Sequence, residues 1–155
     1  MPSSTSSQPA AVPPASCACQ FAYCAISSAV TSPSPSASSA GISHWLSFHG
    51  KSCLSDWDQI YYQASPYDSH GLYQKFSPVT YWDDLNTPTL ILHGEVDQDV
   101  PVEQSYLFHR ALKDKGVPTE LVVYPREAHG VTEKAHILDM SRRVIRWMKK
   151  YLRLD

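Results

Sequence analysis

Two strand-like runs, each followed by a loop and a helical pattern, most constrain what this chain can fold into. The first run spans residues 89–93, and the helix predicted after its loop extends from about Val102 to Lys115. The second run spans residues 119–125, with a helix predicted from about Thr132 to Leu152. Two strand-loop-helix units in succession predict an α/β fold with parallel strands, right-handed crossovers and flanking helices.

Apolar spacing within the two predicted helices indicates which faces pack on the sheet. In the first helix the spacing selects Val102, Tyr106, Leu107, Ala111 and Leu112. In the second helix it selects Ile137, Met140, Val144, Trp147, Met148 and Tyr151.

The loop after each predicted strand carries a residue suited to acid–base chemistry. Asp97 follows the first strand and His129 follows the second. Neighbouring parallel strands lie about 5 Å apart, so groups at their carboxyl ends can come within hydrogen-bond reach. An aspartate that orients a histidine, and a histidine that accepts a proton from a nucleophile, are two members of a serine-hydrolase triad. In α/β-hydrolases the order along the chain is Ser, then Asp, then His.

Other interpretations of these loop residues stay open. Asp97 and Asp99 could each cap the following helix, and Asp99 is the main rival for the role of orienting a histidine. His129 taken alone could be an ordinary loop histidine. We expect Glu95 to be solvated and His93, which directly follows the strand, to pack or hydrogen-bond locally.

The first 50 residues contain no Asp, Glu, Lys or Arg, which divides the chain in composition. Residues 1–40 are rich in Ser, Ala and Pro and keep no helical or alternating pattern for two turns. Such a segment cannot bury enough apolar surface to offset its ordering entropy, so we predict disorder there. The predicted organisation is a low-complexity segment at 1–40 and a folded domain at 41–155.

Residues 41–85 are dense in aromatic side chains. Ser55 is predicted as the N-cap of a short helix. A second short helix is predicted after Gly71, and the Ser77-Pro78 turn ends it. Aromatic residues at this density pack against a core or line a pocket, and packing is the favoured interpretation.

Cysteine spacing and charge exclude several kinds of site. Three cysteines lie within residues 17–24 in a Cys-x-Cys-x4-Cys arrangement and the fourth is Cys53, which does not match a zinc site. We therefore expect no metal and no cofactor. The net charge of −2 and the pI near 6.4 argue against a nucleic-acid partner. No apolar run reaches the roughly 20 residues of a membrane span, and no positive charge precedes the apolar stretch 15–30 as in a secretory signal. The cytoplasm is slightly favoured on these grounds.

Several segments together match a known pattern: SPVTYWDDLNTPTLILHG at 77–94, Asp-x-x-Val-Pro at 97–101, QSYLFHRALKDKG at 104–116, VPTELVVYP at 117–125 and REAHG at 126–130. The stretch from Gly41 to Asp155 thereby resembles the C-terminal part of the catalytic domain of prolyl oligopeptidase family serine peptidases. This group includes acylaminoacyl peptidases and dipeptidyl peptidases. The resemblance implies the C-terminal half of an α/β-hydrolase domain, with Asp97 as the catalytic aspartate and His129 as the catalytic histidine.

The nucleophile of that family lies in Gly-x-Ser-x-Gly, on a tight strand-to-helix turn. No two glycines of this chain are four positions apart, so the motif is absent from these 155 residues. The nearest imitation is residues 37–41, centred on Ser39. We expect no strand before Ser39, because Pro33 and Pro35 cannot both pair in a sheet.

The resemblance implies hydrolysis of peptide bonds in short peptides by the Ser-Asp-His mechanism, and we expect the isolated chain to be inactive without the nucleophile. A truncated or frame-shifted reading of a peptidase gene would explain why the N-terminal 50 residues contain no charged side chains. The alternative is a short protein, a non-catalytic interaction module or pseudoenzyme derived from an α/β-hydrolase. Half a sheet leaves an unpaired edge and uncovered helix faces, which favours self-association or a missing domain partner.

Overall fold

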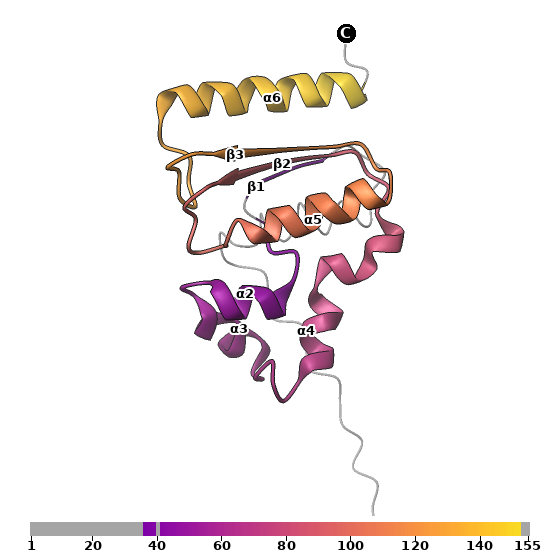
Figure 1. Ribbon diagram of the computed structural model, residues 1–155, viewed down its shortest axis with the longest axis vertical. Coiled ribbons are helices and arrows are strands. Elements are labelled where there is room, and N and C mark those ends of the chain that lie inside the picture. The colour runs from indigo at the N-terminus through magenta and orange to yellow at the C-terminus, as the bar shows by residue number, and fades with distance from the viewer. Residues whose placement is uncertain (1–35, 40, 153–155) are drawn as a thin grey trace, which may run out of the picture.

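The computed structural model describes residues 36–39 and 41–152, which form a parallel sheet with helices on both faces (Figure 1). In chain order the elements are β1 (Ser36–Ser39), α2 (Trp45–Lys51), α3 (Ser55–Tyr62), α4 (His70–Phe76), the 3-10 helix η1 (Pro78–Asp84), β2 (Thr89–Gly94), α5 (Glu103–Asp114), β3 (Thr119–Tyr124) and α6 (Lys134–Leu152). The predicted α/β class and both predicted strand-loop-helix units are confirmed. Within the described ranges, no helix is both long and apolar enough to cross a membrane.

The strand order is β1-β2-β3, and both neighbouring pairs are parallel. Strand β2 is central, and all six of its residues are buried. In the register of the sheet, Leu92 of β2 lies opposite Ser39 of β1 and Val122 of β3, and Gly94 lies opposite Tyr124. The loops that follow β2 and β3 therefore leave the sheet at the same edge.

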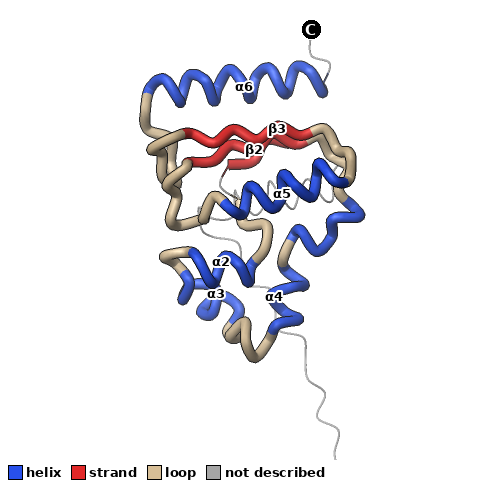
Figure 2. The backbone as a smooth tube through the Cα atoms, in the orientation of Figure 1, coloured by secondary structure: helices blue, strands red, loops and turns tan. Residues whose placement is uncertain are grey.

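Helices α5 and α6 cover opposite faces of this sheet (Figure 2). Leu90 and Leu92 pack in one cluster with Trp147 of α6, whereas Ile91 packs with Phe108 of α5. This alternation follows from the two-residue period of a strand, which turns successive side chains to opposite faces. The apolar run of β2 thus serves two separate layers of the core.

The buried face of α5 differs from the predicted one. The sequence predicts Tyr106 and Leu107 on the packed face, but both are exposed, and Phe108 is buried instead. Gln104, Phe108 and Leu112 are spaced by four and form the buried line. The polar Gln104 belongs to this line because hydrogen bonds satisfy its side chain, which hydrophobic spacing alone does not show.

Strand β1 lies where no strand is predicted, and that prediction is wrong. The strand begins at Ser36, after both prolines, and pairs through its backbone with β2 from Thr89 to Leu92. Backbone pairing does not require apolar side chains, so a serine-rich run can complete the ladder of a buried neighbour. Residues 1–35 and 40 lie outside the described residues, so the disorder predicted for them and the boundary at 41 stay predictions.

Helices α2, α3 and α4 form an aromatic layer next to α5. Trp45, Phe48 and Tyr73 are buried in one cluster, and the ring centroid of Tyr62 lies 5.1 Å from that of Trp45. The predicted packing role of these aromatic residues is confirmed. Ser55 is the first residue of α3 and not its N-cap, which corrects the predicted start by one residue.

The buried Gln104 side chain ties this layer to α5. Its Oε1 accepts hydrogen bonds from the backbone N–H groups of Ser43 (3.1 Å) and His44 (2.9 Å). Its Nε2 donates to Oγ of Ser47 at 2.9 Å. One side chain therefore anchors the start of α2 after the chain leaves β1.

The loop after β3 lies directly against the end of β2. The backbone N–H of Val96 donates to the carbonyl oxygen of Glu127 at 3.0 Å. A Cβ atom on Gly94 would lie 2.1 Å from the carbonyl oxygen of Ala128 and 2.4 Å from that of Glu127. Because both neighbours are backbone atoms, only glycine fits at the end of β2 without moving the loop that carries His129.

Glu127 holds the other end of this loop against the start of α6. Its buried carboxylate accepts bonds from the N–H groups of Thr132 (2.8 Å) and Glu133 (2.9 Å) and from Nδ1 of His136 (2.8 Å). These N–H groups precede α6 and lack partners within the helix, so the carboxylate both caps and charge-complements the helix start. Burial alone would raise the pKa of Glu127, but these hydrogen bonds outweigh it and lower the pKa to about 2.

We predict that Gly94→Ala lowers the free energy of unfolding by about 2 kcal/mol or more, because its Cβ cannot fit beside two carbonyl oxygens. The measurement is urea denaturation followed by tryptophan fluorescence. Gly130→Ala, in the loop that packs on Gly94, is the matched control, since a Cβ there meets nothing within 4 Å. Equal stability of the two variants would contradict the prediction.

We also predict that Glu127 contributes to the pH dependence of stability. Its pKa is lower in the folded protein than the ordinary value of 4.5, so its contribution is fully present above pH 4.5 and is lost as the pH falls toward 2. The free energy of unfolding should therefore fall with decreasing pH across this window, and Glu127→Gln should flatten that part of the profile. Urea titrations at several pH values measure both slopes, and identical slopes would refute the assignment.

Candidate active site

Asp97 lies in the turn after β2, where its carboxylate is buried. Its Oδ1 accepts hydrogen bonds from the backbone N–H groups of Asp99 (3.0 Å) and Val100 (2.9 Å). Such side-chain-to-backbone bonds two and three residues ahead are typical of aspartate in a turn before a helix. They fix the orientation of the carboxylate and leave Oδ2 facing the neighbouring loop.

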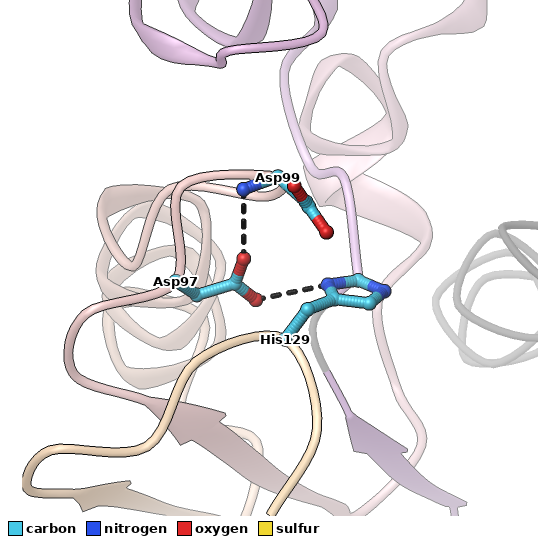
Figure 3. Close-up of side chains that lie close together, drawn as sticks. All are labelled: Asp97, Asp99 and His129. Atoms are coloured by element: carbon cyan, nitrogen blue, oxygen red, sulfur yellow. Dashed lines mark hydrogen bonds and ion pairs between the residues drawn. The ribbon is translucent and has the colours of Figure 1, made fainter.

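His129 supplies the partner of Oδ2. Its Nδ1 lies 3.0 Å from Oδ2 of Asp97, and the ring is 39 % exposed. Figure 3 shows Nε2 pointing away from the carboxylates, toward the side of the sheet on which β1 lies. Because a carboxylate accepts at Nδ1, the hydrogen of a neutral ring resides there, and Nε2 is left as the proton acceptor.

A second imidazole, from His93, contacts the same carboxylate from inside the protein. Its Nε2 lies 2.8 Å from the carbonyl oxygen of Val100 and 3.3 Å from Oδ2 of Asp97, and its Nδ1 lies 2.6 Å from Oγ of Ser105. A carbonyl oxygen only accepts, so Nε2 carries a hydrogen and the Ser105 hydroxyl donates to Nδ1 of the neutral ring. The local hydrogen bonding predicted for His93 is confirmed. Its contact with Asp97 was not predicted, and the only sequence feature that relates the two residues is their separation by four positions.

The surroundings of Asp97 favour its charged form. Burial raises the pKa of Asp97, but the hydrogen bonds from His93, the Val100 N–H and His129 together outweigh it and hold the pKa below its usual value. At neutral pH a buried negative charge therefore lies beside Nδ1 of His129. Such a charge stabilises an imidazolium ring when Nε2 takes up a proton.

The remaining acids of the loop take different positions. Glu95 is exposed, as predicted. Asp99 is half-buried, and its carboxylate points toward the His129 ring in Figure 3. Its Oδ1 accepts the Cys53 thiol at 3.3 Å, whereas the hydrogen bond to His129 is made by Asp97. Geometry therefore favours Asp97 over Asp99 as the orienting group, and the catalytic assignment of Asp97 and His129 stays a prediction.

Among the residues that the structure describes, two groups of side chains could each hold a metal ion. Asp97, Asp99 and His129 form one, and Glu127, Glu133 and His136 form the other, with ligand atoms within 4.8 Å of one another in each group. The first coincides with the Asp97–His129 pair and the second with the start of α6.

The model of the prolyl oligopeptidase family matches residues 36–155. The uncharacterized peptidase YuxL of Bacillus subtilis is 35 % identical over 118 residues, which are 72 % of this chain and 18 % of that protein. The acylamino-acid-releasing enzyme of Homo sapiens is 33 % identical over 76 residues, 49 % of this chain and 10 % of the human enzyme. The chain thus spans less than a fifth of the length of these relatives.

Solved structures show the same arrangement of elements. A puromycin-hydrolyzing peptidase of Mycobacterium tuberculosis superposes with a TM-score of 0.79 at 23 % identity, over 84 % of this chain and 20 % of that chain. An acylaminoacyl peptidase in complex with Z-Gly-Gly-Phe-chloromethyl ketone superposes with a TM-score of 0.76 at 25 % identity, over 83 % of this chain and 22 % of that chain. The match of the family model starts at Ser36, the first residue of β1, and so includes the whole sheet. The chain belongs to the prolyl oligopeptidase family.

Proposed function

We propose that this chain carries the aspartate and histidine of a serine-peptidase triad, with Asp97 orienting His129. The observation that carries the proposal is the 3.0 Å bond between Oδ2 of Asp97 and Nδ1 of His129, with Nε2 unhindered by either carboxylate. Both residues stand at the carboxyl ends of adjacent parallel strands, where catalytic groups of open α/β sheets gather. Membership of a peptidase family supports the same chemistry.

In this mechanism Nε2 of His129 takes the proton of a serine hydroxyl as its oxygen attacks the peptide carbonyl carbon. The same nitrogen then returns the proton to the amine that leaves when the C–N bond breaks. Asp97 remains charged throughout and stabilises the imidazolium form that exists between these two steps. The acyl-enzyme is finally hydrolysed by water, again with His129 as the base.

The serine itself would come from a strand that pairs with β1. No described residue pairs with the outer edge of β1, so this edge can accept another parallel strand. The carboxyl end of such a strand would lie at the edge of the sheet that carries Asp97 and His129, on the side to which Nε2 points. Ser39, the last residue of β1, lies in the nearest imitation of the motif and is the alternative to be tested.

Short peptides are the proposed substrates. Relatives of the chain include enzymes named acylamino-acid-releasing enzyme and dipeptidyl-peptidase, names that refer to acylamino acids and to dipeptides. Because the chain matches only a minor part of each relative, the preference among peptides would depend on segments beyond the match.

We predict that the purified 155-residue chain has little or no activity on chromogenic aminoacyl substrates, because no Gly-x-Ser-x-Gly turn presents a nucleophile. His129→Ala and Ser39→Ala are measured in parallel, at equal protein concentration. Clear activity that His129→Ala abolishes would overturn the prediction, and loss in Ser39→Ala as well would identify Ser39 as the nucleophile.

A non-catalytic interaction module is the second candidate, and the outer side of α6 supports it. Leu138, Ile145 and Leu152 are spaced by seven and are 56 %, 57 % and 45 % exposed. An apolar stripe of this spacing on a charged helix is typical of surfaces that meet another helix. Together with the open edge of β1, it provides the chain with a surface for a second copy or for a missing domain partner.

We predict for this candidate that the chain elutes earlier in size-exclusion chromatography as its concentration rises. Ile145→Lys should abolish the shift, because a charge within the apolar stripe opposes association. Ile60→Lys on α3 is the control, since Ile60 is 76 % exposed and lies outside the stripe. A compact monomer at every concentration argues against the interaction module.

A further inference from the structure

The ring of His93 is the inner member of a chain of polar contacts that ends at His129. Its side chain is fully buried, and its Nδ1 lies 2.6 Å from Oγ of Ser105 on α5. On the other side of the ring, Nε2 lies 2.8 Å from the carbonyl oxygen of Val100 and 3.3 Å from Oδ2 of Asp97. The contacts therefore run from α5 through the end of β2 to the candidate active site.

Ser105 determines how the ring of His93 can be used. The groups that face Nε2, a carbonyl oxygen and an ionised carboxylate, accept hydrogen bonds and cannot donate, so the ring hydrogen resides on Nε2. Nδ1 of the neutral ring then requires a donor, and the buried hydroxyl of Ser105 supplies it. His93 is thereby held as a donor directed toward Asp97.

Donors surround the carboxylate of Asp97 on both oxygens. An ionised carboxylate offers about four lone-pair positions. The backbone N–H groups of Asp99 and Val100 occupy Oδ1, and the rings of His93 and His129 face Oδ2. All of these donors except His129 are fixed by backbone or by burial. They oppose rotation of the carboxylate and leave one position on Oδ2 for the half-exposed ring.

We propose that His93 is a positioning residue, which keeps Oδ2 of Asp97 in place so that the hydrogen of the His129 ring stays on Nδ1. The neighbouring Asp99 gives this positioning a purpose, because its carboxylate also points toward the His129 ring (Figure 3). If the Asp97 carboxylate could turn, the ring would be free to bind Asp99 or water through either nitrogen. Ser105 acts one step further away, by holding His93 as a donor. The importance of this positioning for catalysis rests on the function proposed for His129, whereas the contacts themselves do not.

His136 provides a reference within the same protein. Its Nδ1 lies 2.8 Å from Oε1 of the buried Glu127 carboxylate, which is the same kind of contact as that between His129 and Asp97. The carboxylate of Glu127 is held by backbone N–H groups at the start of α6, whereas Asp97 faces the ring of His93. A substitution of His93 should therefore change the tautomer of His129 and leave that of His136 unaltered.

The test compares His93→Gln with His93→Asn in the full chain. The amide of glutamine can reach the position of Nε2 and donate to Asp97, whereas asparagine is one methylene shorter and reaches the side of Ser105. Ring-nitrogen NMR spectra, recorded with EDTA at mildly alkaline pH where histidine rings are ordinarily neutral, identify the nitrogen that carries the hydrogen. We expect His129 to carry it on Nδ1 in the unsubstituted chain and in His93→Gln. In His93→Asn this tautomer should cease to be the major one, while His136 keeps its own tautomer in every variant.

An unchanged His129 tautomer in folded His93→Asn would overturn the positioning role alone, as would equal changes in the asparagine and glutamine variants or a parallel change in His136. A hydrogen on Nε2 of His129 in the unsubstituted chain would instead contradict the Asp97–His129 bond on which the proposed function depends. Ser105→Ala decides the question if the His93 variants do not fold, because it removes the donor to His93 without touching Asp97. Its His129 should lose part of the Nδ1–H population, and full retention would overturn the proposal.

Discussion

The position of the His129 imidazole depends on one backbone contact, the approach of the loop after β3 to the end of β2. Gly94 has no side chain, and the carbonyl oxygens of Glu127 and Ala128 occupy the space that a Cβ would fill. The parallel register brings the two loops to the same edge, and the close approach at Gly94, together with the bond from the Val96 N–H to the Glu127 carbonyl oxygen, holds them within hydrogen-bond distance. In the sequence Gly94 is typical of a residue that ends a strand, but in the structure the site requires a glycine at this position.

Two buried carboxylates with different tasks hold this arrangement. Glu127 is saturated by donors at the start of α6 and acts as a structural anchor two residues before His129. Both oxygens of Asp97 also accept hydrogen bonds. The donor to Oδ2, however, is the half-exposed imidazole of His129, whose Nε2 can take up a proton. Burial opposes ionisation in both residues, and hydrogen bonds outweigh it in both. Glu127 and Asp97 differ in the exposure of the histidine that each one binds: His136 is 17 % exposed and His129 is 39 % exposed.

Much of this arrangement could be predicted from the sequence, because β2, β3, α5 and α6 have strong apolar periodicity and clear ends. Strand β1 could not, since its serine-rich residues pair through the backbone and carry no apolar signal. The buried face of α5 was misplaced because Gln104 is polar and satisfied by partners about 60 residues away. The approach of Cys53 to Asp99 joins two distant loops, and local spacing holds no information about such contacts.

The two imidazoles that share Oδ2 of Asp97 differ in their access to water, and this has a spectroscopic consequence. The ring of His93 is wholly buried, with its Nε2–H directed at the Val100 carbonyl, so that hydrogen exchanges slowly with solvent. The His129 ring is 39 % exposed, so we expect the hydrogen on its Nδ1 to exchange faster. In proton NMR spectra, a sharp downfield ring N–H resonance is therefore expected from His93. Its chemical shift would report on the charge of the Asp97 carboxylate even when fast exchange broadens the His129 signal.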